Sequence, residues 1–97
     1  MPYTLIIKEE ASRDTVDAYL FYETKATGLG EQFLSALKEK YDKITENPYY
    51  FSFIFPDKEK KFRDVKLTGF PYLVIYDFTE KEVIVYAVHS SHRKSKI

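Results

Sequence analysis

The hydrophobic pattern of this chain changes its period once, at Asn47-Pro48. Before this point, after a short opening segment, apolar residues recur every three or four positions, which is typical of amphipathic helices. After it, they alternate or run continuously, which is typical of strands. A helix is expected to end here, because the residue before a proline disfavours helical geometry. Helices and strands segregated along the chain predict an α+β fold.

The first part of the chain predicts one strand and two helices. In residues 3–8, Tyr3, Leu5 and Ile7 fall on one face and the residues between them on the other, and this period of two predicts the strand. A helix is expected from Glu9, and a second from about Glu31 to Asn47. In the first helix the inward stripe is expected to contain Ala11, Thr15, Ala18 and Tyr22, widened by Val16, Tyr19 and Leu20. In the second it is expected to contain Phe33, Leu34, Leu37, Tyr41 and Ile44. Gly28 and Gly30 can supply positive φ angles between them, so we expect an antiparallel helical hairpin.

The second part of the chain predicts three strands, at residues 62–67, 72–78 and 83–88. The last of these is apolar on both faces, so we expect it to lie inside the sheet. The aromatic run 49–55 is expected to be an edge strand or an extended connection. The predicted order is β-α-α-β-β-β in one domain spanning 1–97, with the helix hairpin packed on one face of a small, largely antiparallel sheet. The opposite face would be free for a site.

Composition excludes several classes of protein. The chain has no cysteine, which excludes a disulfide scaffold, a zinc–thiolate site and a thiol nucleophile. It shows no signal-peptide pattern and no apolar run of membrane-spanning length, so we expect a cytoplasmic protein without a membrane partner. Its 15 basic and 15 acidic residues are divided unevenly, because residues 57–97 hold nine basic and six acidic ones. We therefore expect a modest basic face that needs a structured target.

An ordered set of motifs carries a resemblance to a known family. In chain order these motifs are Ala11 and Asp14, Tyr22, Gly28, Phe33-Leu34, Asn47-Pro48, Arg63, Phe70-Pro71-Tyr72, Tyr76 and Arg93. With them, the chain resembles the RelE/ParE superfamily of toxins from bacterial type II toxin–antitoxin modules. The Phe-Pro-Tyr element is more similar to the ParE-type and plasmid stabilisation branches than to RelE itself.

The resemblance implies a small toxin that a cognate antitoxin holds inactive. RelE-like members are ribosome-dependent ribonucleases, whereas ParE-like members inhibit DNA gyrase and cleave nothing. Our first hypothesis is mRNA cleavage on the ribosome. The alternatives are non-enzymatic inhibition of gyrase and a degenerate toxin that only binds its antitoxin.

Metal-free RNA cleavage needs groups that move protons and groups that stabilise a charged phosphorane-like transition state. The resemblance places Arg63 and Arg93 at the family's basic positions, where both could hold phosphate. His89 and His92 are the candidate acids or bases. Weaker candidates for phosphate binding are Lys61, Lys66 and Lys94. Departures from the ribonuclease pattern keep the alternatives open, since Ser90 stands where relatives have histidine and Tyr72 stands where RelE-like enzymes have arginine.

No cofactor or metal is expected, because two histidines separated by two residues without nearby carboxylates make a poor ligand set. The antitoxin is expected to contact the aromatic residues Tyr49, Tyr50, Phe51 and Phe53. Such a run is too apolar for an ordinary loop. We expect it to form a groove with the helix hairpin and the sheet rim, and an acidic antitoxin tail to neutralise the basic patch.

Overall fold

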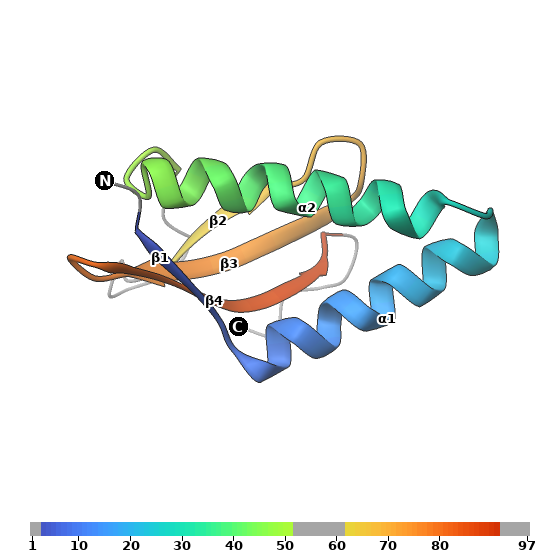
Figure 1. Cartoon of the computed structure of the whole chain (residues 1–97), viewed down its shortest axis with the longest axis horizontal. Helices are drawn as coiled ribbons and strands as arrows, with labels where there is room; N and C mark the ends of the chain where they lie inside the picture. Colours follow the sequence, from blue (N-terminus) through green and yellow to red (C-terminus); the bar gives the residue numbers. More distant parts are fainter. Residues whose placement is uncertain (1–2, 52–61, 92–97) are drawn as a thin grey trace.

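Two helices cover one face of a four-stranded sheet in the computed structural model, which describes residues 3–51 and 62–91 (Figure 1). The expected order of elements is confirmed. Along the chain they are β1 (Thr4–Ile7), α1 (Glu9–Lys25), α2 (Leu29–Glu46), β2 (Arg63–Lys66), β3 (Tyr72–Phe78) and β4 (Glu82–Ser90). In the sequence, the helix hairpin therefore stands between β1 and the other three strands of the sheet.

The strand order in the sheet is β1-β4-β3-β2. β4 pairs with β3 in antiparallel fashion and with β1 in parallel fashion, and β2 pairs with β3 in antiparallel fashion. The sheet is therefore largely antiparallel, as expected, with one parallel edge strand. Since β4 lies between two neighbours, the prediction that residues 83–88 form an inner strand is confirmed.

The turn between the helices depends on a carboxylate and two glycines. Gly28 has a φ of 89°, the left-handed geometry that glycine adopts without strain. The Oε1 atom of Glu23 accepts hydrogen bonds from the backbone N–H groups of Gly28 and Gly30, at 2.9 and 2.8 Å. Gly30 lies within α2, and a Cβ there would come within 2.8 Å of the Tyr19 ring and of Glu23. Gly28 thus turns the chain, and Gly30 permits the close approach of the two helices.

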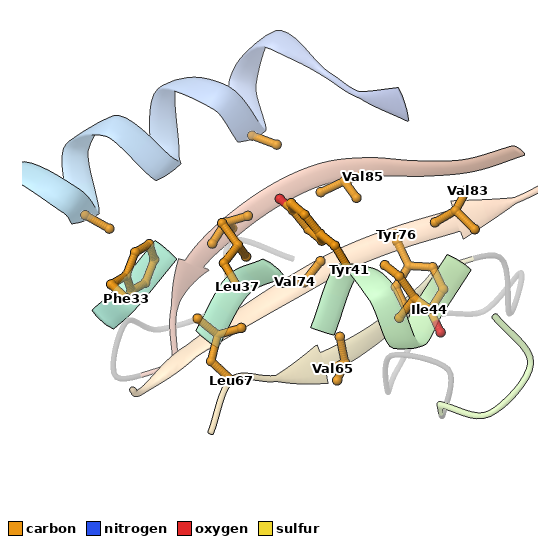
Figure 2. Packing of buried hydrophobic residues seen from close by; sticks show 13 residues of the cluster. Phe33, Leu37, Tyr41, Ile44, Val65, Leu67, Val74, Tyr76, Val83 and Val85 are labelled. Atoms are coloured by element: carbon orange, nitrogen blue, oxygen red, sulfur yellow. The ribbon is translucent and has the colours of Figure 1, made fainter. Parts of the chain in front are cut away.

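The hydrophobic core lies between α2 and the sheet (Figure 2). α2 contributes its predicted stripe, with Phe33 and Ile44 fully buried and Leu37 and Tyr41 nearly so. The strands contribute Val65, Val74, Tyr76, Val83, Val85 and Val88, and Leu67 follows β2. The buried residues of α1 are two alanines, Ala11 and Ala18.

The expectation that Val16 and Leu20 widen the buried stripe of α1 is wrong. Their side chains are 56% and 55% exposed, and the neighbouring Phe21 is 50% exposed. At about 100° per residue, Val16 and Leu20 lie roughly 140° and 180° around the helix from Ala11, and thus face away from the core. α1 therefore has an exposed apolar side.

The chain after α2 also differs from its expected form. α2 begins at Leu29, two residues before the expected start, and Tyr49–Phe51 lie in a turn and bend rather than a strand. Residues 52–55 of the predicted aromatic segment lie outside the described residues. The Tyr76 hydroxyl donates a buried 2.8 Å hydrogen bond to the Pro48 carbonyl. This bond joins the chain just after α2 to the middle of β3.

Candidate functional site

Arg63 lies on the helix-covered side of the sheet. It pairs across the strands with Tyr76, which is fully buried, and paired residues share a face of the sheet. Its Nη1 donates a 2.7 Å hydrogen bond to the Phe51 carbonyl, and its guanidinium carbon lies 5.4 Å from the centre of the Phe78 ring. Arg63 therefore does not lie on the face of the sheet that we expected to be free for a site. In this structure its guanidinium holds the segment that follows α2.

The opposite face of the sheet, here called the open face, carries two of the predicted site residues. Lys66, Leu73 and His89 form one row across β2, β3 and β4. Asp64 lies in the next row, paired with Ile75. Burial raises the pKa of the Asp64 carboxyl, and the charge of His89 partly offsets this rise. The open face thus carries His89, Asp64 and Lys66 in neighbouring rows. The sequence predicted His89 and Lys66 as site residues but not Asp64.

The remaining predicted residues fall into two groups. Lys61, His92, Arg93, Lys94 and Phe53 lie outside the described residues. Tyr49, Tyr50 and Phe51 lie in the turn after α2. Tyr49 and Tyr50 are 65% and 76% exposed, whereas Phe51 is partly buried against the core. Their role as antitoxin contacts stays a prediction. The Tyr49 ring packs edge-on against Phe78, with a centroid distance of 4.7 Å. This aromatic surface lies at the end of β3 that is farthest from Tyr72.

A pocket of about 490 Å³ lies between α1 and the end of β4. α1 contributes Asp14, Asp17, Phe21 and Tyr22 to its wall, and the sheet side contributes Pro71, Tyr72 and residues 88–90. Sequence reasoning did not predict this pocket. Two signals point to it, namely the outward Phe21 beside Asp17 and the Phe70-Pro71-Tyr72 motif that begins β3.

Asp14 joins α1 to β4 at the wall of this pocket. β1 pairs with β4 only as far as Val85, so Val88 has no partner in β1. Asp14 Oδ2 accepts a 2.9 Å hydrogen bond from the Val88 backbone N–H at this edge. A carboxylate from the helix therefore satisfies a donor that a strand would otherwise have paired.

Replacing Asp14 with alanine should lower the free energy of unfolding by about 1.5–3 kcal/mol, since a half-buried N–H loses a charged acceptor. Urea unfolding followed by circular dichroism measures the change. Asp17→Ala is the matched control, because Asp17 is exposed on the same helix and its replacement should change stability by less than about 0.5 kcal/mol. Equal stabilities for the two variants would contradict the assigned role of Asp14.

Within residues 3–51 and 62–91, no three histidine or acidic side chains are grouped closely enough to hold a metal ion. Neither described helix is both long and apolar enough to cross a membrane.

Comparison with known proteins identifies the family. Residues 5–95 match the family model described as the ParE toxin of the type II toxin–antitoxin system parDE. A solved structure described as the chromosomal ParDE TA system from P. aeruginosa has a TM-score of 0.76 at 13% identity, covering 91% of this chain and 95% of that one. A mutant of the E. coli toxin RelE in the free state has a TM-score of 0.60 at 20% identity, covering 95% and 86%. The comparison with curated proteins found no similar sequence. Because the family model spans nearly the whole chain, this protein belongs to the ParE toxin family of type II toxin–antitoxin systems.

Proposed function

We propose that this toxin arrests growth in the cytoplasm by binding and inhibiting DNA gyrase, without cleaving RNA, and that a cognate antitoxin prevents it from doing so. The observation that carries the proposal is the position of Arg63. Its guanidinium is bonded to the Phe51 carbonyl and lies over the Phe78 ring on the covered side of the sheet. A phosphate-binding role would require this arginine to leave both partners.

The engagement of Arg63 favours a role in positioning. By holding the Phe51 carbonyl, Arg63 fixes the turn that presents the exposed rings of Tyr49 and Tyr50. Exposed tyrosines supply large contact area at low entropic cost, which suits binding to another protein. In the superfamily that the sequence resembles, ParE-like members act by binding gyrase, in agreement with this arrangement.

A supercoiling assay with purified gyrase tests the proposal. The toxin should inhibit supercoiling at micromolar concentration, and equimolar antitoxin should restore it. Tyr50→Ala should weaken inhibition, whereas Glu39→Ala, at an exposed position on α2, should leave it unchanged. Full gyrase activity at micromolar toxin would contradict the proposal.

Ribosome-dependent mRNA cleavage is the second candidate, and the open face favours it. His89 and Asp64 could exchange protons there, and Lys66 in the same row as His89 could contact phosphate. Mapping of mRNA ends on translating ribosomes tests this candidate. Cleavage that His89→Ala abolishes would replace the gyrase proposal, and normal growth on strong induction without antitoxin would indicate a degenerate toxin.

A further inference from the structure

One side of α1 is apolar and exposed. Val16, Leu20 and Phe21 are each at least half exposed and lie within about two turns of the helix. α1 follows one border of the molecule, with α2 and β4 packed on its inner side (Figure 1). Single exposed apolar residues are ordinary, but three neighbouring ones on one helix are typical of an interaction surface. We call the surface that these three side chains form the outer α1 surface.

The charges that α1 presents to solvent are nearly balanced. Two of its carboxylates are bonded within the molecule, since Asp14 accepts a hydrogen bond from the Val88 N–H and Glu23 accepts two from the turn between the helices. The other charged residues of α1 are exposed, and they are three acids and two bases, namely Glu9, Glu10, Asp17, Arg13 and Lys25. The whole chain has a formal net charge of zero. Net charge therefore does not oppose a contact between two copies.

The exposed charges of α1 are also ordered along its axis. Glu9 and Glu10 lie in its first turn and Lys25 in its last. When two such helices pack antiparallel, the acidic first turn of each lies beside the basic last turn of the other, whereas a parallel pair brings like charges together. α1 therefore carries a charge pattern that is complementary to itself in one direction only.

The middle of α1 decides whether the apolar residues meet in the same arrangement. Asp17 is the middle residue of the helix, and Glu10 and Lys25 lie at nearly equal distances on either side of it. A two-fold axis near Asp17 therefore pairs these charges and also brings the two outer α1 surfaces into contact. Arg13 lies about one turn before Asp17 and supplies a positive charge near the axis, where the two Asp17 carboxylates approach each other.

We propose that two copies of this chain associate through their outer α1 surfaces as an antiparallel, two-fold symmetric dimer. A second copy is the occupant that the observations favour, because the same helix supplies both the apolar contact and the complementary charges. The 17 residues of α1 span about 26 Å. Two helices of this length bury less than the roughly 1,200 Å² of total surface at which stable interfaces begin, so the dimer is weak and the monomer predominates at low micromolar concentration.

Sedimentation velocity of the purified toxin, from micromolar to millimolar concentration, tests this assignment. Leu20→Glu should raise the dimer dissociation constant at least about tenfold, because it places a charge in the apolar contact. Glu10→Lys and Lys25→Glu should each raise it about threefold or more, since each opposes like charges at both ends of the pair. The chain that carries both of these changes should return to within about twofold of the wild type, because the charges then attract in the reversed order.

Glu39→Lys is the matched control, because it makes the same charge change as Glu10→Lys at an exposed site on α2 and should alter the dissociation constant by less than about twofold. Circular dichroism should show the same helix content for all variants. A toxin that stays monomeric at millimolar concentration would overturn the inference. A dimer that Leu20→Glu leaves intact would overturn it as well, since another surface would then hold the copies together. Failure of the doubly reversed chain to regain affinity would overturn the antiparallel arrangement.

Discussion

Phe33→Ala should lower the free energy of unfolding by about 3–5 kcal/mol. Phe33 is fully buried where α2 meets the start of β3. Its ring centre lies 5.5 Å from that of Tyr22, 5.5 Å from that of Phe70 and 5.2 Å from that of Tyr72. The replacement leaves a cavity among three rings from two segments, α1 and residues 70–72, which are both fixed by their own packing and cannot readily move to fill it. The total free energy of unfolding of a small domain is about 5–15 kcal/mol, so the variant should be close to unfolding at 37 °C.

Urea unfolding of Phe33→Ala and Leu20→Ala measures this difference. Leu20 is 55% exposed, and its replacement should change stability by less than about 0.5 kcal/mol. Phe33→Leu should recover most of the loss, since it restores apolar volume. A loss below about 1 kcal/mol for Phe33→Ala would mean that the ring cluster is not packed as described.

The order of elements could be predicted because it depends on local patterns. Three patterns predicted elements from residues that are close together in the sequence. They are the apolar stripe of α2, the helix end at Asn47-Pro48 and the apolar strand at 83–88. The inner position of β4 followed from its two apolar faces. The prediction failed for Val16 and Leu20, where apolar character was taken as burial although helix geometry turns both side chains outward.

The candidate site was less predictable, because strand register decides which face a side chain joins. Shifting β2 by one residue would turn Arg63 to the open face and Asp64 toward the core. No local signal in residues 62–66 specifies the pairing of Arg63 with Tyr76. The pocket beside α1 escaped prediction for a similar reason, since it forms only where α1 meets the end of β4, more than 60 residues later in the sequence.

The second large effect is expected at alkaline pH. Burial raises the pKa of Tyr41 and of Tyr76 to about 12, whereas an unfolded chain loses these protons near pH 10. Between these values the folded state holds more protons than the unfolded state, so its stability falls as pH rises. The contribution is fully present below pH 10 and is lost as pH passes 12. Each tyrosine should account for roughly 2 kcal/mol, measured as the difference in urea unfolding between about pH 8 and pH 12.

Replacement by phenylalanine separates the two tyrosines. Tyr76→Phe leaves the buried Pro48 carbonyl without its donor and should cost about 1–2 kcal/mol at neutral pH. At pH 12 the stability of this variant should nearly equal that of the wild type, because the wild type has by then lost the stability that depends on protonated Tyr76. The Tyr41 hydroxyl is buried with no hydrogen-bond partner among the described residues, so Tyr41→Phe should cost little at neutral pH.

Tyr41→Phe should therefore become more stable than the wild type as pH rises above 10. The stabilities of Tyr41→Phe and Tyr76→Phe relative to the wild type thus distinguish an unbonded hydroxyl from a bonded one. Tyr50→Phe is the control, because this side chain is 76% exposed and its replacement should leave the alkaline loss unchanged. Parallel unfolding profiles for wild type and both core variants would show that the alkaline loss arises elsewhere. A crossing for Tyr41→Phe alone would assign the unbonded hydroxyl to Tyr41 on α2 and the bonded one to Tyr76 on β3.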